Sequence, residues 1–104
     1  MGWFAVANVG ESDELAPLAM QRIAVAGKRL LLCRGQAEYF CIDEMCTHED
    51  YSLAFGCVKD NRIKCSLHGS WFDLASGQAL NAPAECALHT YPTKVEAGQV
   101  WVEV

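Results

Sequence analysis

The chain lacks long apolar runs and clusters of basic residues. None of its uninterrupted apolar runs exceeds five residues, whereas spanning a bilayer takes roughly 20. Eight Lys and Arg are dispersed among 13 Asp and Glu, and the formal net charge is −5, which argues against nucleic acid and membranes as partners. The N-terminus shows no basic segment followed by an apolar core, as an export signal would. We therefore expect a cytoplasmic protein whose acidic surface suits basic protein partners.

The sequence also lacks the motifs of several enzyme and scaffold classes. No G-x-G-x-x-G is present to bind a dinucleotide. None of the six cysteines forms a C-x-x-C pair, and nothing indicates the oxidising compartment that a disulfide framework requires. We expect Cys33, Cys41, Cys57 and Cys86 to be buried, reduced thiols. The other two cysteines each have a histidine nearby.

Short apolar or alternating segments separated by turn residues predict an all-β chain. We expect strands at 3–9, 20–26, 28–34, 37–42, 56–59, 62–65, 86–95 and 99–104. Tight turns are expected at Gly27, Asp60-Asn61 and Ala97-Gly98. Since 104 residues with 52% apolar content suit one core, we expect a single domain, residues 1–104, folded as an antiparallel β sandwich or small barrel.

Two mixed pairs of metal-ligating residues are the most informative feature. Cys46 and His48 lie in Cys-Thr-His, Cys65 and His68 lie in Cys-Ser-Leu-His, and sixteen residues separate the two pairs. One thiolate and one imidazole from each of two loops make the ligand set of a Rieske [2Fe-2S] cluster, with cysteines on one iron and histidines on the other. The hairpin expected at residues 56–65 lies between the pairs, so its folding brings the two loops close together.

Two other metal sites fit these residues less well. Zinc accepts two cysteines and two histidines, but its usual spacing pairs like ligands, and here each pair is mixed. Zinc remains an alternative. A plant-type ferredoxin would use Cys41 and Cys46 as its first two ligands, but it needs a cysteine where this chain has Glu49. That class is excluded.

Three stretches carry a resemblance to a known family: Cys-Thr-His-Glu-Asp at 46–50, Cys-Ser-Leu-His-Gly-Ser-Trp-Phe-Asp at 65–73 and Ser-Gly-Gln-Ala-Leu-Asn-Ala-Pro-Ala at 76–84. With these stretches, and along essentially its whole length, the chain resembles the Rieske-type ferredoxins of bacterial aromatic-ring dioxygenase systems. It implies the three-layered antiparallel Rieske fold, with a small cluster-binding subdomain at about 44–84.

The same resemblance implies roles for individual residues. Cys46 and Cys65 would bind one iron, and His48 and His68 would bind the other near the surface, where the electron leaves. Gly69 would let the backbone approach the cluster, and Pro83 would cover it from a third loop.

The resemblance implies an electron carrier and not an enzyme. Beyond the two histidine ligands only His89 remains, too few for the two histidines and carboxylate of a mononuclear oxygenase iron. We expect His89 to be an ordinary strand residue. The chain would pass electrons, as a monomer, from an NAD(P)H-dependent flavoprotein reductase to a terminal aromatic-ring dioxygenase. The alternative is the Rieske-like small subunit of an assimilatory nitrite reductase.

One departure from cytochrome-associated Rieske proteins bears on the reduction potential. Those proteins have additional cysteines at the positions of Tyr51 and Leu67, and a tyrosine at the position of Phe72. Because Phe72 has no hydroxyl to donate, although Ser70 is retained, we expect a potential of roughly −150 mV rather than +300 mV.

The residues flanking the ligands suggest a docking surface. Asp43, Glu44, Glu49 and Asp50 surround the first pair, and we hypothesise that they steer the protein toward basic partners. Leu67, Trp71 and Pro83 are candidates for an apolar rim. Trp3 and Trp101 are expected in the core.

Overall fold

The computed structural model describes residues 2–8, 16–35, 38–47, 51–66, 69–82 and 84–104. These ranges form strands and one short 3-10 helix, so the predicted all-β class is confirmed. The elements are β1 (Trp3–Asn8), β2 (Met20–Val25), β3 (Lys28–Arg34), β4 (Tyr39–Asp43), the 3-10 helix η1 (Leu53–Phe55), β5 (Cys57–Lys59), β6 (Arg62–Lys64), β7 (Trp71–Asp73), β8 (Thr90–Tyr91), β9 (Thr93–Glu96) and β10 (Gln99–Glu103). Within the described ranges, no helix has the length and apolarity needed to cross a membrane.

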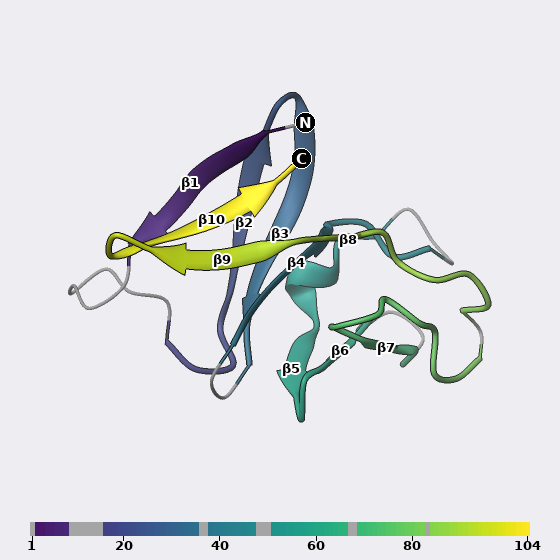
Figure 1. Cartoon of the computed structure of the whole chain (residues 1–104). Coiled ribbons are helices and arrows are strands. Elements are labelled where there is room, and N and C mark those ends of the chain that lie inside the picture. Colours follow the sequence, from purple (N-terminus) through teal and green to yellow (C-terminus); the bar gives the residue numbers. More distant parts are fainter. Residues whose placement is uncertain (1, 9–15, 36–37, 48–50, 67–68, 83) are drawn as a thin grey trace.

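The strands pair into three antiparallel sheets, with orders β1-β10-β9, β2-β3-β4-β8 and β5-β6-β7 (Figure 1). Three tight hairpins join neighbouring strands where the sequence predicts them. Their turn residues Ala26-Gly27, Asp60-Asn61 and Ala97-Gly98 all have positive φ, the conformation that two-residue hairpin turns require.

Strand β3 shows how the sheets are layered. Leu31 and Cys33 on one face of β3 belong to a core cluster that includes Ile63 and Phe72 of the small β5-β6-β7 sheet. Leu30 and Leu32 on its other face belong to a second cluster that includes residues of β10. The sheet that contains β3 therefore has a sheet packed on each face, which confirms the three-layered arrangement. A strand buried on both faces reads as a continuous apolar run, as residues 30–33 do.

Two parts of the strand prediction are wrong. The segment 86–95 is not one strand, because residues 86–89 form none and Pro92 separates β8 from β9. Proline has no N–H to donate to a ladder, and the two pieces join different sheets. Strand β7 is not predicted at all, since its three residues are too few to show a period.

The tryptophans of the terminal strands are less buried than predicted. Trp3 is 36% exposed, and the Lys94 Nζ atom lies 4.4 Å from the centroid of its ring. Trp101 is half-buried, and its indole N–H donates to the Glu96 carbonyl at 3.1 Å. The expectation of core positions is wrong for Trp3 and only partly met by Trp101.

Candidate metal centre

The first ligand loop follows β4 and is closed by main-chain pairing. Met45 and Ser52 form an isolated antiparallel bridge, and the Cys46 N–H donates to the Tyr51 carbonyl at 2.9 Å. These pairings close the base of the loop, and we call this base, residues 45–46 and 51–52, the neck. Cys46 lies on the neck. It is only 7% exposed.

The second ligand loop follows β6 and turns back within a few residues. The Cys65 N–H donates to the Ser70 carbonyl at 2.8 Å, and the Gly69 N–H donates to the Cys65 carbonyl at 3.0 Å. Gly69 has φ +76°, and a Cβ there would meet nothing nearer than the Lys64 Cε at 3.7 Å. Among the described residues, the backbone angle and not crowding is what favours glycine at this turn.

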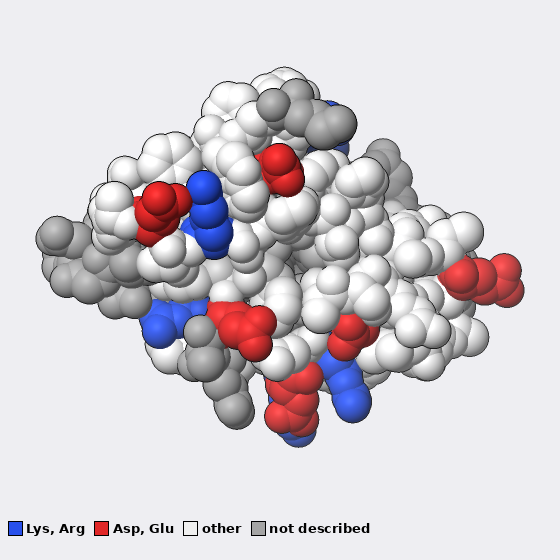
Figure 2. All heavy atoms as spheres, viewed as in Figure 1, with Lys and Arg blue, Asp and Glu red and all other residues white. Residues whose placement is uncertain are grey.

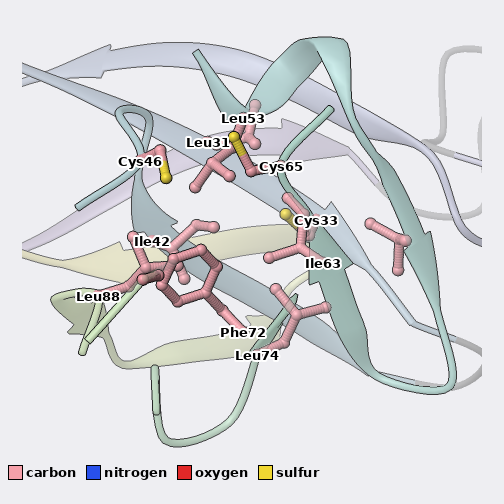
Figure 3. Close-up of a cluster of buried hydrophobic side chains, with 12 residues drawn as sticks. Leu31, Cys33, Ile42, Cys46, Leu53, Ile63, Cys65, Phe72, Leu74 and Leu88 are labelled. Carbon is pink, nitrogen blue, oxygen red and sulfur yellow. The ribbon is translucent and has the colours of Figure 1, made fainter. Parts of the chain in front are cut away.

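The two thiols lie in one buried cluster of side chains (Figure 3). Cys46 and Cys65 share this cluster with Leu31, Leu53 and Phe72. Both thiols are free of disulfides, and Cys65 is only 2% exposed. Two thiols that reach one buried cluster from separate loops suit the cysteine half of an iron–sulfur ligand set, because thiolates are its usual ligands.

His48 and His68, the predicted imidazole ligands, lie outside the described residues. Among the residues that are described, no three His, Cys, Asp or Glu gather as they would to hold a metal ion. The structure places the two predicted cysteine ligands in one buried cluster, and all four ligands remain a prediction.

A third loop ties both ligand loops in place. The Asn81 side chain accepts from the Trp71 N–H at 2.6 Å and donates to the Gly69 carbonyl at 3.2 Å, so it spans the turn after Cys65. The Thr47 hydroxyl donates to the Cys86 carbonyl at 2.8 Å. Sequence reasoning missed Asn81 and Thr47 as positioning residues. The sequence offered one signal for each residue: Thr47 is a short polar residue next to Cys46, and Asn81 is a short polar residue within the third motif, residues 76–84.

Ser70 and Phe72 occupy the interior beside the second loop. Ser70 is 1% exposed, and its Oγ accepts from the Ala84 N–H at 3.1 Å. Phe72 is completely buried. Of the three candidates for an apolar rim, Leu67 and Pro83 lie outside the described residues. Trp71 is half-buried, with the Lys64 Nζ atom 5.8 Å from its ring centroid.

The acids near the first loop do not form one exposed patch. Glu44 is 7% exposed, and Asp43 accepts a 2.7 Å hydrogen bond from the Tyr91 hydroxyl. On the face drawn in Figure 2, acidic and basic side chains are interspersed. Glu44 is therefore not available to a partner, and the steering hypothesis now depends on Glu49 and Asp50, which lie outside the described residues.

The four cysteines not assigned as ligands fall into two groups. Cys33 and Cys41 are buried, as predicted, whereas Cys57 and Cys86 are exposed, so the prediction is wrong for those two. Burial, with a smaller contribution from Asp43, raises the pKa of the Cys41 thiol to about 12. Burial likewise raises the pKa of Cys33 far above its ordinary value, with a smaller contribution from Cys41. Both thiols therefore stay protonated at neutral pH.

His89 is not a strand residue, contrary to the prediction. It lies just before β8, is exposed, and places its ring 4.5 Å from the ring of Tyr91. Its main chain still pairs with β4, because the His89 carbonyl accepts from the Asp43 N–H at 3.1 Å.

Residues 3–92 match the family model of the Rieske [2Fe-2S] domain. The chain belongs to this family. A curated relative, the ferredoxin component of biphenyl 2,3-dioxygenase from Rhodococcus jostii (strain RHA1), is 31% identical over 100 residues, which cover 96% of this Rieske protein and 94% of the relative.

Solved structures agree with the family assignment. A chain in a complex of reduced oxygenase and oxidised ferredoxin of carbazole 1,9a-dioxygenase has a TM-score of 0.87 and 27% identity, covering 96% of this chain and 91% of that chain. A structure described as the small subunit of an NADPH nitrite reductase has a TM-score of 0.82 over 100% of both chains, but at 22% identity it shows the fold alone.

The cofactor of this Rieske protein is a [2Fe-2S] cluster of the Rieske type. The two thiols of one buried cluster fit such a group. Its curated relative is a ferredoxin component, and this protein is likewise an electron-transfer protein and not a catalytic oxygenase.

Proposed function

We propose that this Rieske protein is the ferredoxin of an aromatic-ring dioxygenase system. It carries single electrons from an NAD(P)H-dependent flavoprotein reductase to a terminal Rieske oxygenase. The observation that carries the proposal is that Cys46 and Cys65, which come from two separate loops, lie in one buried cluster and outside any disulfide. Nearly the whole chain, moreover, matches a dioxygenase ferredoxin component.

The proposed ligand set is Cys46 and Cys65 on one iron and His48 and His68 on the other. When bound, the cluster supplies a one-electron couple in the Rieske range. The chain's own task is to hold the four ligands still. Each loop is closed by a main-chain hydrogen bond, from the Cys46 N–H to the Tyr51 carbonyl in the first loop and from the Cys65 N–H to the Ser70 carbonyl in the second.

The protein also excludes water from the cysteine side of the site. Leu31, Leu53 and Phe72 are each fully buried in the same cluster as the two thiols. This shell keeps the local dielectric low and limits the reorganisation that a change of charge requires.

The proposal includes a single domain, residues 1–104, with the cluster-binding subdomain at about 44–84. The sheet β5-β6-β7 falls wholly within the second range. We further propose that the protein is a cytoplasmic monomer, because a carrier must dock weakly and leave quickly, through a small interface.

The ligand set is tested by cluster content. The purified protein should contain about two irons and two acid-labile sulfides per chain, absorb in the visible, and show the low average g-value of a mixed-ligand cluster when reduced. Replacing His48 or His68 with alanine should abolish this signal, whereas H89A, the matched control, should retain it. A colourless protein with one zinc per chain would establish the zinc alternative instead.

The carrier role is tested by reconstitution. Electron flow from NAD(P)H to an oxidised aromatic product should require this protein together with a flavoprotein reductase and a terminal oxygenase. The nitrite reductase alternative predicts obligate co-purification with a large sirohaem enzyme. A freely diffusing monomer that supports product formation would exclude it.

A further inference from the structure

A buried acid beside the first ligand loop has two side-chain partners among the residues that the structure describes. The Glu44 Oε2 atom accepts from the Ser52 Oγ at 2.6 Å and lies 3.1 Å from the Arg22 Nε. The side chain of Glu44 is 9% exposed, whereas that of Arg22 is 53% exposed. The negative charge is thus largely removed from water, while its positive partner remains half in solvent. A buried carboxylate depends on such partners, because desolvation would otherwise disfavour its charge.

The main chain connects Glu44 directly to the first ligand loop. Glu44 stands two residues before Cys46, and its carbonyl accepts from the Leu53 N–H at 2.8 Å. Ser52, which holds its carboxylate, is the bridge partner of Met45 on the opposite side of the neck. Glu44 therefore joins both sides of the neck from which Cys46 is presented.

Arg22 brings a third element to this group. It belongs to β2 in the large sheet, and its guanidinium carbon lies 5.0 Å from the ring centroid of Phe55, at the end of η1. The guanidinium is thereby held over the segment that follows the first ligand loop. The pair has a definite geometry, unlike most ion pairs between long surface side chains.

We infer that the Arg22–Glu44 pair, held by Ser52, sets the reduction potential of the cluster electrostatically. The inference rests on the proposed ligand set through Cys46. Reduction adds a negative charge, which the Glu44 carboxylate opposes and the Arg22 guanidinium favours. Because Glu44 is buried, water screens its effect less than it screens that of Arg22.

The inference predicts opposite signs for the two halves of the pair. E44Q removes the negative charge, keeps the side-chain size and retains an oxygen that accepts from Ser52, so it should raise the potential. R22Q removes the positive charge and should lower the potential. A merely structural clamp would respond in the same direction to the loss of either partner, because both losses loosen the same loop.

The test is the midpoint potential of the holoprotein, measured by voltammetry on both variants. Each should shift the reduction equilibrium at least about threefold, which is roughly 28 mV at 59 mV per tenfold for one electron. The variants K94Q and E96Q are the matched controls, because this pair at 3.0 Å is exposed on β9 of another sheet. They should shift the potential by less than half as much.

Rescue and cluster content keep the outcomes distinct. R22K retains the charge and should restore most of the potential lost in R22Q. If E44Q fails to hold its cluster, the R22Q and R22K comparison decides the matter alone. Shifts of the same sign in E44Q and R22Q, or shifts no larger than the controls, would overturn the inference while leaving the proposed function intact. A wild-type protein without iron and sulfide would overturn both.

Discussion

Gly77→Ala should destabilise the protein far more than Gly27→Ala, although the two glycines have nearly identical backbone conformations. Their φ angles are +79° and +78°, where an L residue costs about 1 kcal/mol or somewhat more. The difference between them is space. A Cβ on Gly77 would overlap the Leu88 carbonyl oxygen, whereas a Cβ on Gly27 would meet nothing within 4 Å.

The magnitude follows from what must move at Gly77. The Leu88 N–H donates to the Gly77 carbonyl at 2.7 Å, and Leu88 packs in the same buried cluster as Cys46 and Cys65. Relieving the overlap sacrifices that hydrogen bond, worth about 1 kcal/mol, and forces repacking that typically costs about 1–3 kcal/mol. G77A should therefore be about 2–4 kcal/mol less stable than G27A.

The assay is thermal unfolding of the holoprotein, followed by far-UV circular dichroism and by loss of the visible cluster absorption. At roughly 4–8 °C per kcal/mol for a domain of this size, G77A should unfold at least about 8 °C below G27A. One scan rate must be used throughout, so that any irreversible loss of the cluster affects both variants alike. Equal midpoints for the two variants would refute the steric argument.

Three further outcomes are expected. Phe72→Tyr should raise the midpoint potential, because it adds a hydroxyl donor within the cluster that contains the thiols. The wild-type midpoint potential should lie below zero at neutral pH, and a positive value measured by voltammetry would contradict that expectation. Charge reversal at Glu49 and Asp50 should slow reduction by the flavoprotein reductase at low salt, and an unchanged stopped-flow rate would remove the steering hypothesis. The Cys41 thiol ionises near pH 9.0 in the unfolded chain and near pH 12 in the fold, since its pKa is raised to about 12 there. The raised pKa favours the folded state only while the thiol is protonated, so stability should fall as the pH rises through this range. Cys41→Ala should reduce this alkaline loss, which is about 1.4 kcal/mol per pH unit. If the argument is wrong, the thermal midpoint will change by the same amount between pH 8 and pH 10 in the two proteins.

The fold was predictable wherever its signal is local. The hairpin turns depend on residues that tolerate positive φ, and such residues can be recognised from the sequence alone. The apolar run in β3 is likewise local. Sheet membership is not, because the break at Pro92 sends β8 and β9 to different sheets through pairings with strands far away in the sequence.

Exposure was harder to predict than strand position. In β5 the burial alternates, with Val58 buried between exposed Cys57 and Lys59. The period of two was visible in advance, but which set faces inward depends on the register against β6. Cys57 was therefore placed on the wrong face by an argument from its apolar character. In Cys33 and Cys41, which lie on the twice-buried central sheet, the same argument succeeded because either face is covered.

In the metal centre, too, some features can be recognised from the local sequence and others depend on tertiary contacts. The residue types at 46, 48, 65 and 68 predict a Rieske-type ligand set, because a thiolate and an imidazole two or three residues apart are a local pattern. Glu44 shows what such a pattern omits. By sequence it is one more acid in a polar loop, yet Arg22 of β2 and Ser52 across the neck convert it into a buried, paired charge. The ligands determine which cluster is bound and therefore that one electron can be accepted. Groups that the fold assembles around the ligands, such as the Arg22–Glu44 pair, can make the reduction potential differ between related proteins with the same ligands.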